Sequence, residues 1–148
     1  MIQPFDDHYF MKQALNEANL AFDNDEIPVG AVIVHDFKVI ARAHNLTETL
    51  NDVTAHAEMQ AFTAAADFLG GKYLNECTLF VTLEPCVMCS GASYWTQLKR
   101  VVYGAADEKS RQKTIKSELF HPKTEVVGGV MAEDCKDLLQ LFFAEKRG

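Results

Sequence analysis

The chain has 148 residues, 48% of them hydrophobic, and a formal net charge of −7 at pH 7. This length and composition predict one domain over residues 1–148 and exclude a disordered or fibrous protein. No apolar run approaches the roughly 20 residues of a membrane-spanning helix, and the N-terminus lacks the pattern of a signal peptide. We therefore expect a cytoplasmic protein without membrane segments, whose four cysteines are thiols or metal ligands.

The charge is unevenly distributed, which bears on the kind of partner. Residues 1–98 carry 4 basic and 13 acidic side chains, whereas residues 99–148 carry 10 basic and 8 acidic ones. The overall acidity argues against sequence-blind binding of nucleic acid. The segment 109–116 holds four basic residues and no acid, so a polyanionic partner is expected to dock there if the segment is more than a solvated surface.

Hydrophobic periodicity predicts alternating helices and strands. Helices are predicted over residues 6–24, 55–69, 86–97 and 132–146, the second capped by Thr54 and the third with Pro85 in its first turn. Strands are predicted over residues 27–34, 38–43, 78–83, 100–105 and 124–127. The order of these elements predicts an α/β fold of three layers, α/β/α, in which one mixed sheet of five strands has helices on both faces.

Two short segments, each at the predicted start of a helix, contain metal-binding residues. Segment 54–58 reads Thr-Ala-His-Ala-Glu, and segment 82–89 reads Thr-Leu-Glu-Pro-Cys-Val-Met-Cys. A catalytic zinc takes three protein ligands and leaves one position open for water. His56, Cys86 and Cys89 supply one nitrogen and two thiolates, and the start of a helix favours the thiolate form. The pattern therefore predicts one Zn²⁺ per subunit on these three residues.

Glu58 is predicted to be catalytic and not a metal ligand. Residues two apart on a helix do not lie side by side, so Glu58 is poorly placed to bind the ion beside His56. A carboxylate near a zinc-activated water would take its proton, deliver it to a ring nitrogen, and help ammonia leave.

Each half of this pattern has an ordinary alternative. An isolated His-x-Glu is usually a solvated surface pair, and an isolated Cys-x-x-Cys can be a redox pair or half of a structural zinc site. A structural site needs a fourth ligand, and Cys77 and Cys135 form no second pair. A redox pair would not account for the upstream His-x-Glu. Their joint occurrence favours a catalytic zinc.

The two segments resemble the cytidine-deaminase-like superfamily, whose signature is His-x-Glu followed by Pro-Cys-x-x-Cys. More of the chain is similar to the tRNA-specific adenosine deaminase family of bacteria. The matching stretches span nearly the whole chain and are Asp25–Val32, Ala43–Asn45, Thr54–Glu58, Leu83–Ala92, Val101–Ala105 and the Phe142–Phe143 end.

The resemblance implies a homodimer with a five-stranded sheet between helices, which converts adenosine to inosine at the wobble position of a tRNA anticodon. It further implies that Asn45 contacts the flipped nucleoside, and that Val29 and Ala57 line the base pocket. Trp95 is expected in the core or at the dimer interface.

The chain also departs from the family in the loops expected to grip RNA. Val53 stands where the family usually has proline, and segment 110–119 is charged and glycine-free where the family usually has a glycine-rich segment. Within that segment Arg111, Lys113 and Lys116 are the predicted RNA contacts.

Three hypotheses for function follow. The favoured one is hydrolytic deamination of adenosine in the anticodon loop of tRNA. The second is deamination of a free base or nucleoside, such as guanine, cytosine or cytidine, which the net acidity and the altered segment favour. The third, a structural zinc module or a binding subunit without activity, is disfavoured because Glu58 is intact.

Overall fold

The computed structural model describes residues 5–108 and 118–147. Within these two ranges, nine elements follow one another, and their order is the predicted one. They are α1 (Asp7–Asp23), β1 (Gly30–His35), β2 (Lys38–His44), α2 (Ala57–Leu69), β3 (Cys77–Leu83), α3 (Val87–Thr96), β4 (Arg100–Ala105), β5 (Glu125–Val127) and α5 (Ala132–Arg147).

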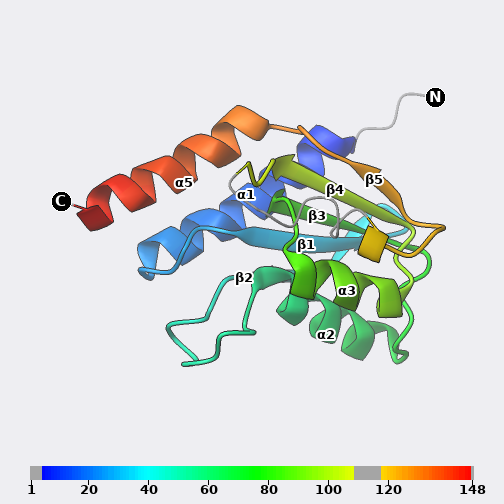
Figure 1. Ribbon diagram of the computed structural model, residues 1–148. Helices are drawn as coiled ribbons and strands as arrows, with labels where there is room; N and C mark the ends of the chain where they lie inside the picture. Colours follow the sequence, from blue (N-terminus) through cyan, green and yellow to red (C-terminus); the bar gives the residue numbers. More distant parts are fainter. Residues whose placement is uncertain (1–4, 109–117, 148) are drawn as a thin grey trace.

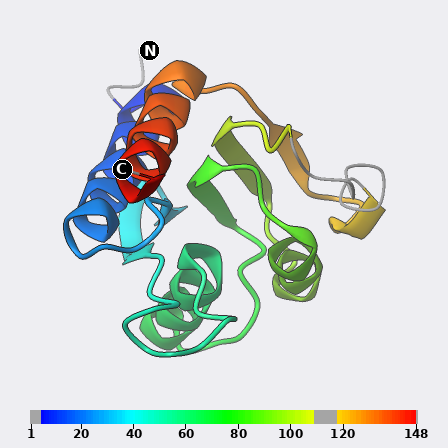
Figure 2. The same cartoon turned by 60° about the vertical axis from the view of Figure 1, so that its left-hand side comes forward.

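The five strands form one mixed sheet in the order β2-β1-β3-β4-β5. Strand β1 is antiparallel to both of its neighbours, whereas β3, β4 and β5 run parallel. Helices α1 and α5 lie on one face of the sheet, and α2 and α3 lie on the other (Figure 1). A view turned by 60° shows the same three layers (Figure 2), so the predicted α/β/α architecture is confirmed.

The central strands are buried on both faces, which explains their nearly continuous apolar sequences. In β1, Ala31 and Ile33 join the core beneath α2, while Val32 and Val34 join the core beneath α1. The same alternation places Phe80 of β3 against Phe10 of α1, with ring centroids 5.3 Å apart. The sheet is therefore a rigid support for the loops at its edges.

Close packing of α1 on β1 depends on Gly30. A Cβ atom at this position would lie 2.0 Å from the carbonyl oxygen of Ala14 and 2.4 Å from the backbone nitrogen of Ala18. Only glycine fits such a contact, because a real Cβ atom would force the helix off the strand. Gly30 thereby fixes the start of β1, and the segment just before it forms one wall of the candidate site.

Two predicted helix starts are wrong by one or two residues. Helix α2 begins at Ala57 with His56 as its N-cap, because Thr54 donates from its hydroxyl and its backbone to Asp52 instead of capping the helix. Helix α3 begins at Val87 with Cys86 as its N-cap, so Pro85 precedes the helix and is not part of its first turn. Both corrections place a predicted metal ligand at the N-cap itself.

No helix among the described residues is long and apolar enough to cross a membrane.

Candidate active site

The candidate site lies where the start of α2 meets the loop between β3 and α3. His56 has an extended backbone, with φ −70° and ψ 156°, and its side chain makes no capping hydrogen bond. Cys86 also has an extended backbone, and its sulfur accepts a hydrogen bond from the backbone N–H of Cys89 at 3.5 Å. Two helix N-termini therefore point their first side chains at one another.

The three predicted ligands have the spacing that a tetrahedral zinc requires. The Nδ1 atom of His56 lies 3.6 Å from the Sγ atom of Cys86 and 3.5 Å from that of Cys89. Zinc bonds of about 2.0–2.1 Å to nitrogen and about 2.3 Å to sulfur place the two ligand atoms about 3.5–3.6 Å apart at tetrahedral angles. Among the described residues, this is the group of His, Cys, Asp and Glu whose ligand atoms lie close enough to share one ion.

Hydrogen bonding within this group polarises the two thiols. A hydrogen bond from the Cys89 thiol, assisted by the His56 ring, lowers the pKa of Cys86 to about 4. The same bond and burial raise the pKa of Cys89. The hydrogen bond to Cys86 also raises the pKa of His56. A thiolate beside an imidazole at a helix start is a ready ligand for a soft divalent cation.

Glu58 lies beside this group in the first turn of α2. Its side chain is 4% exposed, and the nearby thiol of Cys89 lowers its pKa by less than burial raises it. Burial raises the pKa of Glu58 to about 7. A carboxyl group that titrates near neutrality can both accept and return a proton. His56 is the N-cap of α2 and Glu58 lies in its first turn. The Glu58 carboxyl is therefore near the three candidate ligands but is not one of them.

A cavity of about 230 Å³ opens over these residues. The three residues named by the resemblance, Val29, Asn45 and Ala57, all line it together with His56, Glu58 and Cys86. Asn45 is 6% exposed, and its side-chain amide donates to the Ile27 carbonyl at 3.4 Å. Its side-chain oxygen accepts from the backbone N–H of Thr47 at 3.3 Å. The amide plane is thereby fixed at the rim of the cavity.

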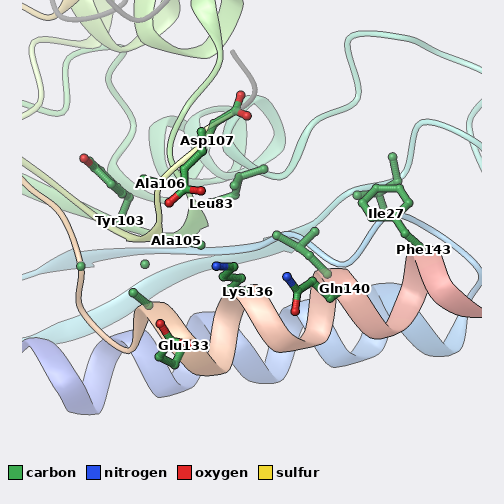
Figure 3. Close-up of a pocket in the computed structure, with 15 residues that line it drawn as sticks. Ile27, Leu83, Tyr103, Ala105, Ala106, Asp107, Glu133, Lys136, Gln140 and Phe143 are labelled. Carbon is green, nitrogen blue, oxygen red and sulfur yellow. The ribbon is translucent and has the colours of Figure 1, made fainter.

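A larger groove of about 780 Å³ adjoins the cavity. Ile27, Leu83 and Asp107 line both, so the two hollows share a wall. The groove lies between α5 and the ends of β3 and β4, and Lys136 and Gln140 point into it from the helix (Figure 3). The cavity and the groove therefore form one longer depression in the surface.

Some residues of the site were not anticipated from the sequence. Thr47, Glu84 and Asp107 also line the smaller cavity, and Glu84 accepts a hydrogen bond from the backbone N–H of Asp107 at 2.9 Å. The position of Glu84 directly before Pro85 and the cysteine motif is the signal that would have identified it. The predicted RNA contacts Arg111, Lys113 and Lys116 lie outside the described residues.

Comparisons with known proteins agree with this geometry. The MafB19-like deaminase family matches residues 5–147. The tRNA-specific adenosine deaminase of Bacillus subtilis (strain 168) is 43% identical over 146 residues, covering 95% of this chain and 91% of that protein. Its namesake from Agrobacterium fabrum is 42% identical over 144 residues, covering 94% and 95% of the two chains.

Solved structures similar to this chain include a tRNA deaminase and also guanine deaminases. A structure from a study of A-to-I editing by tRNA:A34 deaminases is 39% identical, with a TM-score of 0.80, and the match covers 88% of this chain and 98% of that one. A guanine deaminase from Bacillus subtilis is 38% identical, with a TM-score of 0.63, over 75% and 69% of the two chains. A guanine deaminase from Nitrosomonas europaea, at 21% identity and a TM-score of 0.81, shares the fold.

The two curated relatives match over more than nine-tenths of this chain and of their own length, a region that includes the candidate metal ligands and the buried glutamate. This chain therefore belongs to the tRNA-specific adenosine deaminase family, within the MafB19-like deaminases.

Proposed function

We propose that this protein hydrolytically deaminates adenosine to inosine at the wobble position of tRNA. The observation that carries the proposal is the placement of His56, Cys86 and Cys89 beside buried Glu58 at the base of a cavity. The relatives named for this activity match over more than nine-tenths of the chain. Such an enzyme would work in the cytoplasm, where its RNA substrate is found.

His56, Cys86 and Cys89 would hold one Zn²⁺, since their donor set and spacing fit that ion. When bound, zinc would supply a water molecule activated for nucleophilic attack at neutral pH. The rest of the chemistry falls to side chains of this chain.

Glu58 would move the protons. Deamination exchanges the exocyclic amine of adenine for oxygen, so one water is consumed and one ammonia is released. Glu58 would take a proton from the attacking water and deliver it to the adjacent ring nitrogen. It would then transfer the second proton of that water to the departing amine. Its burial beside Cys89 keeps bulk water from competing for these protons.

Val29, Ala57 and Asn45 would hold the flipped base. Val29 and Ala57 are apolar and form walls for the ring, while Asn45 presents an amide fixed by Ile27 and Thr47. The remaining donor of Asn45 and its second acceptor position are available to a nucleoside. A base that leaves its loop to enter this cavity brings its flanking nucleotides toward the adjoining groove.

The groove favours an RNA substrate over a free base. A free base needs only the 230 Å³ cavity, whereas a nucleotide within a loop needs room on both sides of the reacting base. The groove of about 780 Å³ that shares Ile27, Leu83 and Asp107 with the cavity offers that room. We therefore place the anticodon loop across both hollows, and we keep Arg111, Lys113 and Lys116, which lie outside the described residues, as the proposed phosphate contacts.

Deamination of a free base is the second candidate, and one observation favours it. A guanine deaminase is 38% identical to this chain over three-quarters of its length. Incubating the purified protein with an anticodon stem-loop that carries adenosine at the wobble position, and separately with guanine and cytidine, distinguishes the two. Inosine in the stem-loop with no conversion of the small substrates supports the proposal, and conversion of guanine alone replaces it.

The protein would act as a homodimer. Trp95 of α3 is 76% exposed, so it lies outside the core of the chain, and Phe68 of α2 is 68% exposed. Both helices lie on the same face of the sheet (Figure 2), and large exposed aromatics are enriched at interfaces. Sedimentation of the wild-type protein as a dimer, and of Trp95→Asp as a monomer, is the expected result. A wild-type monomer would refute the dimer.

A further inference from the structure

A buried carboxylate lies below the loop between β2 and α2, away from the candidate metal ligands. Glu26 follows α1, after Asp25 with its positive φ of 65° turns the chain, and its side chain is fully buried. Removing a charged group from water is unfavourable unless the group is fully hydrogen-bonded. The hydrogen-bond partners of this buried carboxylate therefore indicate what it holds in place.

All three hydrogen bonds recorded for this carboxylate come from one short stretch of the loop. The backbone N–H of Glu48 donates to Oε1 at 3.0 Å, and the backbone N–H of Thr49 donates to Oε2 at 2.7 Å. The Thr49 hydroxyl also donates to Oε2 at 2.6 Å. Burial alone raises the pKa of Glu26, but these bonds outweigh it and lower the pKa below its ordinary value. The side chain is therefore charged at neutral pH and satisfied by the loop.

Apart from Glu26, the loop is held by hydrogen bonds within its own backbone and by contacts at its two ends. Leu50 is 54% exposed and Val53 is 85% exposed, so neither anchors the loop in the apolar core. A segment that buries few apolar side chains depends on its hydrogen bonds for a fixed conformation. The other long-range bonds lie at its base, where Leu46 donates to the Ala55 carbonyl and Asn45 to the Val29 carbonyl, each at 3.0 Å.

The loop connects two parts of the site. It begins at Asn45, which lines the cavity, and ends at His56, one of the candidate metal ligands. Thr47, which also lines the cavity, lies between Asn45 and the two residues held by Glu26. Its backbone N–H orients the side-chain oxygen of Asn45. A displacement of residues 48 and 49 would therefore be transmitted through Thr47 to the amide of Asn45.

We propose that Glu26 is a positioning residue for substrate, whose buried carboxylate anchors residues 48 and 49 and so sets the orientation of Asn45 and Thr47 at the rim of the cavity. The proposal rests on the proposed function, because it assigns to Asn45 the contact with the reacting nucleoside. Glu26 itself touches no reacting group and acts through the loop.

Three variants test the anchor, with matched chemistry. Glu26→Gln keeps the size of the side chain but turns an amide NH₂ toward a backbone N–H, which removes one bond and adds a clash of donors. Thr49→Val removes the hydroxyl bond and leaves both backbone bonds in place. Glu48→Gln removes a carboxylate from the same loop while keeping its backbone N–H, and its side chain is exposed. It controls for the change in charge.

The first measurement is hydrogen exchange, which needs no substrate. Glu26→Gln should speed exchange of the Glu48 and Thr49 amides by about 10-fold or more, as expected for a lost charge-assisted bond. Thr49→Val should do so by less, and Glu48→Gln should not. Exchange in β1 and β3 and the zinc content should stay at wild-type values. Unchanged exchange of the loop amides in Glu26→Gln would overturn the proposal, and Thr49→Val repeats the test should Glu26→Gln fail to fold.

The second measurement is a double-mutant cycle on a stem-loop substrate. Glu26→Gln should lower kcat/KM by about 100-fold, as expected when a substrate contact is misplaced by about an ångström. If Glu26 acts through Asn45, then Asn45→Ala should cost much less in the Glu26→Gln background than in the wild type. Losses that simply multiply would show that Glu26 only stabilises the fold.

Failure of the proposed function can be told apart from failure of this inference. If the wild-type protein converts guanine and no RNA, the function is wrong, and the same cycle is run with guanine, where non-additive losses still support the anchor. If RNA is deaminated but loop exchange does not respond to Glu26→Gln, the function stands and the anchor is wrong.

Discussion

The Nδ1 atom of His56 lies 3.6 Å from the Sγ atom of Cys86, although 30 residues separate them in the chain. Each is the N-cap of its helix, so the backbone of two different elements aims them at the same point. A cap position normally uses its side chain to satisfy the first N–H groups of the helix. His56 makes no such bond, and its ring nitrogen lies instead beside the two sulfurs, which leaves it available as a metal ligand.

This relationship leads to a prediction about metal. The purified protein should contain one Zn²⁺ per chain, and Cys86→Ala should lose it and melt at a lower temperature, because zinc binding is coupled to folding. Cys77→Ala is the matched control, since Cys77 is a buried free thiol outside the group. Elemental analysis with thermal melting measures both effects. Full zinc retention in Cys86→Ala, or two ions per chain, would contradict the assignment.

The ion pair between α1 and β4 predicts a dependence of stability on pH. Arg100 donates two parallel hydrogen bonds of 2.9 Å to Asp7, and these lower the pKa of Asp7 below its ordinary value. Because the pKa of Asp7 is lower in the folded state than in the unfolded state, the ion pair stabilises the fold fully at pH values above the unfolded-state pKa. This stabilisation is lost as the pH falls through the folded-state pKa.

Asp7→Asn should therefore reduce the free energy of unfolding at pH 7 by about 1 kcal/mol, the upper range for a partly exposed pair with bidentate geometry. The difference from wild type should disappear as the pH falls through the lowered pKa of Asp7 and shrink in high salt. Urea unfolding at several pH values measures it. A difference that persists unchanged at low pH would mean that the asparagine acts through packing or capping and not through charge.

The basic segment gives a prediction about RNA binding. Changing Arg111, Lys113 and Lys116 together to Ser should weaken binding of an anticodon stem-loop and make the salt dependence less steep. The slope of log K against log salt should fall by about 2, since each phosphate contact contributes roughly 0.7–0.9. Turnover of bound substrate should be unchanged.

The matched control changes three exposed lysines, Lys12, Lys38 and Lys72, to Ser, which removes the same charge elsewhere on the chain. It should leave the slope near its wild-type value. Asn45→Ala should lower turnover without altering the slope, because it contacts a base and no phosphate. Equal loss of slope in both triple variants would show that RNA responds to the net charge and not to the basic segment.

The fold, and the proximity of the three candidate ligands, could be predicted from the sequence for physical reasons. Successive residues of β1 and β3 pack into the two cores on opposite faces of the sheet, with Val32 and Phe80 in the core beneath α1. Strands buried on both faces have continuous apolar sequences, which identify them as strands. The ligand set follows from residue types that are rare together, His56 with Cys86 and Cys89. The predicted cap of α2 was wrong because the Thr54 hydroxyl donates to Asp52. The observed N-cap is His56, one of the candidate metal ligands.

The anchor at Glu26 could not be predicted in the same way. Its partners are 22 and 23 residues away and are backbone groups of Glu48 and Thr49, which carry no sequence signature as donors. The adjoining groove is hidden for a similar reason, since its walls come from strand ends and from α5, which only the fold brings together. Both features depend on contacts between segments that are distant in the sequence. Hydrophobic periodicity reports only on residues that are close together in the chain, so it could not reveal them.

The central claim is that the group of His56, Cys86 and Cys89 carries out deamination with Glu58 as the proton carrier. The most direct test compares wild-type protein and Glu58→Gln, both assayed for zinc, on a stem-loop with adenosine at the wobble position under single turnover. Wild type should form inosine, and Glu58→Gln should keep its zinc and lose about 10²–10⁴-fold in rate, the usual contribution of general acid–base catalysis. A Glu58→Gln protein that retains zinc and forms inosine within a few-fold of the wild-type rate would contradict the claim.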